Sequence, residues 1–420
     1  MADILFAFDP ALDRPVPAPD AAPAEVAAAV SRAAADAFDA AVEAARAAGS
    51  HALVLCGRVL DPRRGSPAQA ARLRRQITAL AADRCCTVVM TSDPADSAEL
   101  VRMLGEPAGL RFVTPLAPLV LDVGGLDVEL ALAHDRGSAD LAAVSSAPLH
   151  RRIVVGWDTA FWQSERWDDR VEDRAGAPLT PAAFAAAAAA SPVWSHPGTF
   201  LIWASRGQHA APSGVHLLPP LQARSQHEAA AGSCCGLTLL ERVASRASGG
   251  STEPLAAPHA DWRSSWREIA THRVAWRTLA IDSPAGGDEE LATAIWSGLE
   301  ALTPAAHAPL EIVSCSIACG TSVARRVRVA EIAAETLARV RQLYDATTFR
   351  VWCRDLVADA GESLAPLGHT RSGSRPGTTT SFSSALADIV AGLEQSPSPA
   401  IPAELAREAG WLALELVEST

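Results

Sequence analysis

The sequence has no long hydrophobic run and lacks several of the short motifs that mark common enzyme families. No stretch of 18 or more apolar residues is free of charge and proline, which excludes an ordinary membrane-spanning helix. The first residues, MADILFAFDPALDRP, carry neither the positive start nor the long apolar core of a signal peptide. No Walker or dinucleotide fingerprint is present, and GTSVA at 320–324 matches the GxSxG motif of a nucleophile elbow only in part. We therefore expect a cytoplasmic protein without a membrane segment.

Net positive charge and metal-type cysteine spacing are also missing. The formal net charge is −12, the wrong sign for a chain that binds nucleic acid mainly by neutralising phosphates. A local basic strip at Arg72, Arg74 and Arg75 is interpreted as the solvated face of a helix. The eight cysteines contain no CxxC and no Cys/His zinc pattern, so we expect buried free thiols.

Apolar runs alternate with helical patterns along most of the 420 residues, which predicts an α/β fold. In the first part, strands are expected at 3–8, 51–56, 86–91, 111–114, 119–123, 128–133, 200–204 and 236–243, with helices at 25–48 and 67–82. In the second part, strands are expected at 271–281, 309–319 and 349–357, with helices at 288–302 and 327–343. Because loops at strand carboxyl ends carry the chemistry of such folds, the positions of interest are Asp9, Arg58, Thr91 and His134.

Composition divides the chain into two domains and a C-terminal segment. Residues 1–243 form the larger domain, with a Trp- and Asp-rich insertion at 157–198. A linker at 244–265 leads to a smaller α/β capping domain at 266–358. A low-complexity linker at 359–382 precedes two amphipathic helices within 383–420.

Six segments, in order, resemble the SbcD-like exonuclease subunits among the calcineurin-type metallophosphoesterases. The segments are FAFDPALDRP, LVLCGRVLDPRRGSP, VVMTSDPAD, LALAH, WASRGQH and VHLLPPLQARSQHEAAAGSCCGLTLLE, the last keeping Gln222, Arg224 and Ser225. The resemblance covers most of the chain and implies a two-sheet metallophosphoesterase sandwich flanked by helices.

The resemblance also implies a two-metal site, of which this chain keeps three of eight positions. The family's metal ligands match Asp9, His134 and His209. Other residues stand at the remaining ligand positions, namely Ala11, Arg58, Thr91 and Gly207, and Ser92 stands at the catalytic histidine position. Arg58 replaces the carboxylate that bridges both ions, so it removes a ligand and adds a repelling charge.

We therefore expect a structural pocket in which Arg58 pairs with Asp9, and no bound cofactor; a metal, if bound, would be manganese or magnesium. Two alternatives stay open: a working two-metal centre, and one weak mononuclear site formed by Asp9, His134 and His209. The insertion offers a further set of acidic side chains as substitute ligands, Asp158, Glu165, Asp168 and Asp169.

The function that follows is a catalytically inactive homologue of the exonuclease subunit, acting as a scaffold or regulatory subunit in DNA repair. The resemblance implies a homodimer, DNA as a ligand of the capping domain, and C-terminal helices that dock an SbcC-type ATPase. The same helices could instead dock on their own domain. The alternatives are an active phosphodiesterase or nuclease with a rearranged or single-metal site, and a regulator that forms a heterodimer with an active paralogue.

Overall fold

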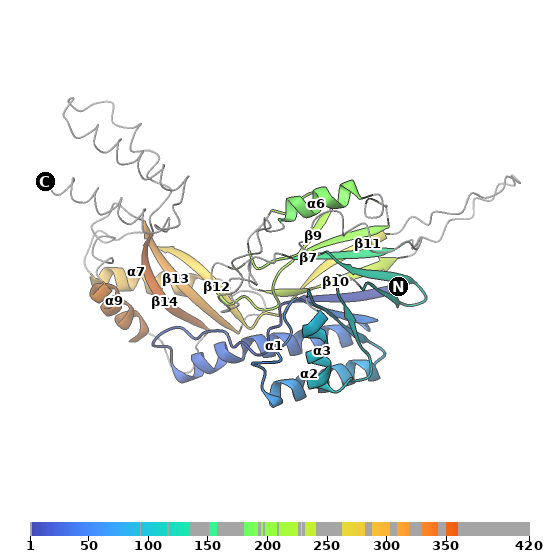
Figure 1. Cartoon of the computed structure of the whole chain (residues 1–420). Coiled ribbons are helices and arrows are strands. Elements are labelled where there is room, and N and C mark those ends of the chain that lie inside the picture. The colour runs from blue at the N-terminus through green and yellow to red at the C-terminus, as the bar shows by residue number, and fades with distance from the viewer. Residues whose placement is uncertain are drawn as a thin grey trace, which may run out of the picture. The chain divides into compact units, whose positions relative to one another are not determined.

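A computed structural model of the chain describes two compact units (Figure 1). The described residues are 2–92, 94–115, 117–133, 151–157, 180–191, 195, 198–207, 210–225, 228, 232–240, 263–281, 288–302, 309–318, 327, 330–342 and 350–359. Unit 1 comprises 1–277, 303–312 and 349–352, and unit 2 comprises 278–302, 313–348 and 353–420. None of the helices in the described ranges combines the length and the apolar character that crossing a membrane requires.

The described strands form three sheets. The six-stranded sheet has the order β11 (Arg263–Ala270), β10 (Ser233–Leu240), β1 (Ala2–Phe8), β2 (Ala52–Cys56), β3 (Cys86–Met90) and β4 (Leu110–Val113). The five-stranded sheet has the order β5 (Leu119–Asp122), β6 (Asp127–Leu132), β7 (Arg152–Trp157), β8 (Thr199–Ala204) and β9 (Val215–Leu218). The three-stranded sheet has the order β12 (Val274–Ile281), β13 (Leu310–Ala318) and β14 (Val351–Asp359). Strands β1 to β4 are parallel, as are β6 to β9, so each large sheet has one edge at which carboxyl ends gather.

Six helices lie in the described part of the chain: α1 (Ala24–Ala47), α2 (Pro67–Ala82), α3 (Pro94–Leu104), α6 (Pro181–Ala190), α7 (Asp288–Ala301) and α9 (Ala330–Gln342). The predicted α/β class is thus confirmed.

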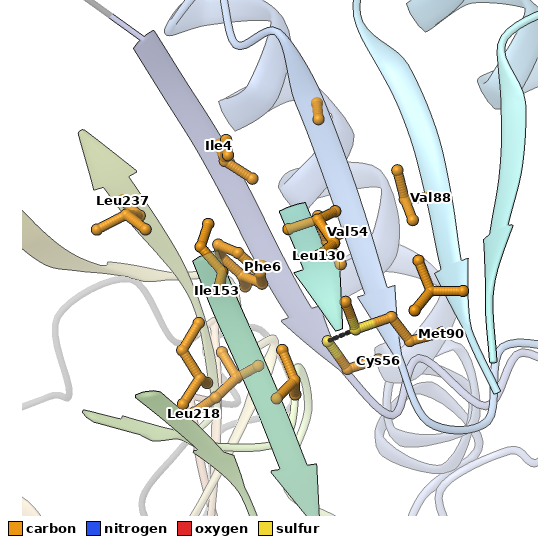
Figure 2. Close-up of a cluster of buried hydrophobic side chains, with 14 of the residues drawn as sticks. Ile4, Phe6, Val54, Cys56, Val88, Met90, Leu130, Ile153, Leu218 and Leu237 are labelled. Atoms are coloured by element: carbon orange, nitrogen blue, oxygen red, sulfur yellow. Dashed lines mark hydrogen bonds between the residues drawn. The ribbon is translucent and has the colours of Figure 1, made fainter. Parts of the chain in front are cut away.

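The six-stranded and five-stranded sheets share one hydrophobic core (Figure 2). Phe6 and Val54 from the first sheet meet Leu130, Ile153 and Leu218 from the second, and all are at most 2% exposed. These strands are apolar on both faces because each sheet is covered on both sides, which explains their continuous hydrophobic runs.

Helices cover the outer faces of the same two sheets. On the six-stranded sheet, Phe38 of α1 and Leu73 of α2 pack with Leu53 of β2. On the five-stranded sheet, Phe184 of α6 packs against Trp203, with the ring centroids 5.5 Å apart. The layers in unit 1 are therefore helices, sheet, sheet and helix.

The start of α2 is fixed by its own sequence and tied to the segment after β1. Ser66 caps the helix and forms a reciprocal capping box with Gln69, and Pro67 occupies the first turn, where it costs no hydrogen bond. The Gln69 amide also donates to the Leu12 carbonyl at 2.7 Å. A local helix signal thereby helps to hold the loop that follows Asp9.

Unit 2 contains α7 and α9, which pack against each other, and most of β13 and β14. The Arg341 side chain of α9 donates to the carbonyls of Cys353 and Arg354 in β14.

Four described elements were not predicted from the sequence, namely α3, β7, β9 and β11. Strand β11 reads RSSWREIA and has mostly exposed side chains, because it is an edge strand with only Trp266 and Ile269 turned toward apolar neighbours. Its first residues fall within the segment 244–265 that was expected to be a linker. The predicted C-terminal helices and residues 158–179 of the insertion lie outside the described residues.

The seven described cysteines are free, and all but the partly buried Cys86 are buried, as predicted. Burial raises the pKa of the Cys85 and Cys234 thiols to about 12. These thiols are therefore protonated and unreactive at neutral pH.

Truncating Phe6 tests the core shared by the two sheets. Phe6→Ala leaves a cavity between them, and we expect the free energy of unfolding to fall by about 3–5 kcal/mol. Val120→Ala is the control, because Val120 is 48% exposed and surface changes of this kind stay within about 0.5 kcal/mol. Urea unfolding of both variants measures the difference, and equal losses would contradict a core at this position.

Candidate functional site

The carboxyl ends of strands from both large sheets meet beside Asp9. Phe8 ends β1 and forms a parallel bridge with Pro220, which follows β9 in the other sheet. The Leu221 amide donates to the Phe8 carbonyl at 2.7 Å, which fixes this junction. Segments far apart in sequence are therefore joined at the edge where loop residues of parallel sheets carry chemistry.

The segments after β1 and β2 run side by side beyond the ends of their strands. The Asp9 amide donates to the Cys56 carbonyl, and the Ala11 amide donates to the Arg58 carbonyl, each at 2.9 Å. Asp9 and Ala11 have positive φ angles of 52° and 39°. Aspartate tolerates the left-handed region better than alanine, so Ala11 is held there by its surroundings, where it is fully buried.

Asp9 forms a buried ion pair with Arg206, which follows β8 by two residues. The Arg206 Nε donates to Asp9 Oδ2 at 2.6 Å, and Nη2 contacts the same oxygen. The two side chains are 1% and 4% exposed. The other carboxylate oxygen, Oδ1, is buried and has no hydrogen-bond partner. The pair joins the end of one sheet to the end of the other.

Arg224 reaches into the same region from the loop after β9. Its Nη1 donates to the Arg14 carbonyl at 2.6 Å, and its Nη2 donates to the Ala11 carbonyl at 3.1 Å. The Nε is buried without a hydrogen-bond partner. Burial lowers the pKa of Arg224, and the nearby Asp9 charge opposes that shift.

Glu228 supplies the second acidic group. Its Oε2 accepts from the Arg224 backbone amide at 2.9 Å. Burial raises the pKa of Glu228, and the Arg206 charge opposes the shift. Glu228 thus braces the loop that carries Arg224.

Gln222 anchors this loop to the corner between β11 and β12. Its side-chain oxygen accepts from the Arg273 and Val274 amides at 2.7 and 3.2 Å, and its nitrogen donates to the Val274 carbonyl at 2.8 Å. The side chain is 2% exposed. Gly232 makes the close approach possible, because a Cβ there would lie 2.9 Å from the Gln222 Cα. The conformation of the Arg224 segment is therefore set by buried hydrogen bonds.

The arginine that the structure records on Asp9 is Arg206, whereas the sequence analysis named Arg58. Arg58 lies in the adjacent segment, half-buried, with its carbonyl on the Ala11 amide. Arg206 lies in the segment WASRGQH, and the resemblance implies no role for an arginine at this position. Its position two residues after an apolar strand is the sequence feature that could have identified it as a site residue.

The other predicted positions that the structure describes lie around the same edge. The Thr91 amide donates to the Val113 carbonyl at 3.0 Å, and Ser92 follows it, half-buried. The Gly207 amide donates to the Ser205 hydroxyl at 3.1 Å. His134 and His209 lie outside the described residues, as do the four acidic residues of the insertion.

The described side chains do not fit a two-metal centre. In the described part of the chain, no three His, Cys, Asp or Glu side chains group in a way that could hold a metal ion. The Asp9 carboxylate already carries the Arg206 guanidinium on its Oδ2. A divalent ion needs several converging oxygen or nitrogen ligands, and a fixed cation beside the carboxylate opposes its binding.

No protein-family model and no curated protein matches the chain.

Removing Arg206 tests the buried ion pair. Arg206→Met leaves the Asp9 carboxylate buried without its partner, which should lower the free energy of unfolding by about 3–5 kcal/mol. Adding Asp9→Asn removes the stranded charge and should recover part of the loss; asparagine is chosen because it tolerates the left-handed backbone. Chemical denaturation measures the free energy of unfolding of the unaltered chain, Arg206→Met and the double variant.

The matched control for this pair is Arg46→Ala, which breaks the exposed ion pair with Asp83. It should change stability little, because exposed pairs are screened by solvent. A similar small effect for Arg206→Met would show that Asp9 and Arg206 are not paired in the protein.

Proposed function

We propose that this chain is a catalytically inactive, SbcD-like member of the calcineurin-type metallophosphoesterases that acts as a scaffold or regulatory subunit in DNA repair. The observation that carries the proposal is the Arg206 guanidinium on Asp9, at the edge where strand ends of two sheets meet. The family uses this kind of edge for its metal ions.

The layer order supports the finer fold assignment. Two sheets with a shared core and helices on their outer faces are what a metallophosphoesterase sandwich requires. Asp9 follows β1, Arg58 follows β2 and Thr91 follows β3, which is the order of the family's ligand-bearing loops. The three-stranded sheet with α7 and α9 supports the proposal of a capping domain.

The loss of metal chemistry follows from charge. Two divalent ions need a surplus of negative ligands, whereas this edge holds the cations Arg206 and Arg224 beside Asp9. The guanidinium of Arg206 neutralises the carboxylate that an ion would otherwise neutralise. An internal cation of this kind balances the buried carboxylate, but it does not supply the metal ion that activates water in the family.

The proposed role as a subunit comes from the family resemblance and from the C-terminal segment. The proposed partners are DNA, a second copy of this chain or an active paralogue, and an SbcC-type ATPase. The apolar residues of 383–420 are the proposed contact for the ATPase.

Metal titration tests the inactive site. On the full chain freed of metal by a chelator, Mn²⁺ titration calorimetry should give no saturable binding. A chromogenic phosphodiester should not be hydrolysed with Mn²⁺ or Mg²⁺ present. Two ions bound per chain would contradict the proposal, and one ion with activity lost in Asp9→Ala would establish the single-metal alternative.

Deleting 383–420 tests the partner. Co-purification with a co-expressed SbcC-type ATPase from the same cell should be lost, while the circular dichroism and melting temperature of the remainder persist. Retained co-purification would remove the C-terminal segment from the interface. A shortened chain that ends at residue 382 and carries Phe6→Ala serves as the unfolding control.

A further inference from the structure

A groove of about 420 Å³ lies at the surface of unit 1, beside the helices α2 and α3, which pack side by side (Figure 1). Its walls come from the loop before α2, from the first half of α2 and from the end of α3. They include Pro62, Pro67, Ala70, Ala71, Arg74 and Met103. Pockets that take ligands have volumes of roughly 300–1,000 Å³. This α2 groove is therefore large enough for a bulky side chain of a partner.

The lining of the α2 groove is apolar except for Arg74. The Arg74 guanidinium lies beside Gly105, where a Cβ atom would come within 3.4 Å of Nη1. The Arg74 carbonyl accepts from the Thr78 hydroxyl, but its guanidinium has no hydrogen bond or ion pair with any residue in the part of the chain that the structure describes. An apolar hollow thus has one exposed positive charge that is available to a ligand.

The border of the α2 groove is strongly basic. Six residues that stand next to a lining residue in the sequence are charged, and five of them are arginines: Arg63, Arg64, Arg72, Arg75 and Arg102, with Asp61 as the acid. Two of these arginines have partners, because Arg72 contacts Asp39 and Asp36 of α1 and Arg64 approaches Asp61 at 4.0 Å.

The other three bordering arginines are exposed. Arg63, Arg75 and Arg102 form no side-chain ion pair with another described residue. Together with Arg74 they give the groove four cations that a ligand can reach. The chain as a whole carries a formal net charge of −12, so this surface has the opposite sign to the rest of the molecule. A local field of this kind attracts an acidic partner and orients it on the groove.

We propose that the α2 groove binds an acidic peptide segment of a partner protein. An apolar side chain of that segment fills the hollow between Pro67, Ala71 and Met103, and its carboxylates pair with Arg74 and the arginines at the border. Guanidinium groups suit carboxylates because they bind both oxygens at once. Methionine suits the floor of such a groove because its flexible side chain adapts to different apolar groups.

Two other occupants fit the groove less well. Single-stranded nucleic acid is held by stacking on aromatic side chains, and no aromatic residue of the described chain lines this groove. A second copy that docked through the same face would place these arginines opposite their own symmetry mates, which repels. An acidic peptide satisfies both the apolar lining and the positive border. The inference does not depend on the family assignment or on the site at Asp9.

The three methionines of the chain allow a site-specific test on the full-length protein. Met103 lines the groove, whereas Met90 is buried in the core between the two large sheets. The probe is a synthetic peptide of glutamates around a central pair of leucines, added to protein labelled at the methionine methyl groups. The NMR signal of Met103, assigned with Met103→Leu, should shift saturably while the Met90 signal stays fixed. An unchanged Met103 signal would overturn the proposal.

Altered probes separate the two parts of the recognition. Serines in place of the leucines should weaken binding at least about tenfold, because the buried apolar contact is lost. Lysines in place of the glutamates should abolish binding. A single-stranded oligonucleotide that shifts Met103 at lower concentration than the peptide would overturn the proposal in favour of nucleic acid. A Met103 shift that depends on protein concentration without peptide would overturn it in favour of a second copy.

Paired variants locate the contact. Ala71→Trp fills the groove and should weaken peptide binding at least about tenfold. Ala68→Trp is its control, because Ala68 is an equally exposed alanine of α2 that does not line the groove. Equal binding by these two variants would contradict a peptide in the groove.

A charge reversal tests the role of Arg74. Arg74→Glu should weaken peptide binding by about tenfold, because it replaces one exposed attraction with a repulsion of similar size. Arg32→Glu, at an exposed arginine of α1 away from the lining, should bind the peptide as the unaltered chain does. All four positions are exposed in the described chain, so the melting temperatures of the variants should stay close to that of the unaltered protein. Equal effects of the two arginine variants would show that only the overall charge matters and would overturn the assignment of Arg74.

Discussion

The buried ion pair between Asp9 and Arg206 is the contact on which the candidate site depends. It joins the residue after β1 to the loop after β8, and so it connects the carboxyl ends of two sheets that also share an apolar core and a backbone bridge between Phe8 and Pro220. Because each charge is buried, neither residue can be lost without stranding the other. The positions of Arg224 and Glu228 follow from the same junction, since their loop returns to β1 through the hydrogen bond between Leu221 and Phe8.

Much of the fold could be predicted because its strands and helices differ clearly in pattern. The continuous apolar runs of β1, β2 and β3 and the capped start of α2 at Ser66 are local signals that need no tertiary information. The elements that escaped prediction lack such signals. Strand β9 is four residues long, and β11 is polar because its edge position leaves most side chains exposed.

The edge that carries Asp9 could be expected from the sequence, whereas the contact between Asp9 and Arg206 could not. The rule that chemistry gathers at strand ends identified Asp9, Arg58 and Thr91. Which arginine meets Asp9 depends on how a loop of the second sheet closes over the first, and no sequence spacing encodes that distance. The same holds for Arg224, whose Nη2 binds the carbonyl of Ala11, far earlier in the chain. That Asp9 Oδ1 is buried without a hydrogen-bond partner can be recognised only from the three-dimensional structure.

The position of β1 in its sheet has a consequence for synthesis of the chain. One side of β1 pairs with β2, which follows soon after, whereas the other side pairs with β10, near the end of unit 1. While the ribosome makes the intervening residues, the backbone amides and carbonyls on that side have no β10 to bind. A nascent chain with such an open strand edge is prone to pair with neighbours. Completion of the sheet, and with it the closure of the edge around Asp9, therefore waits until β10 has emerged.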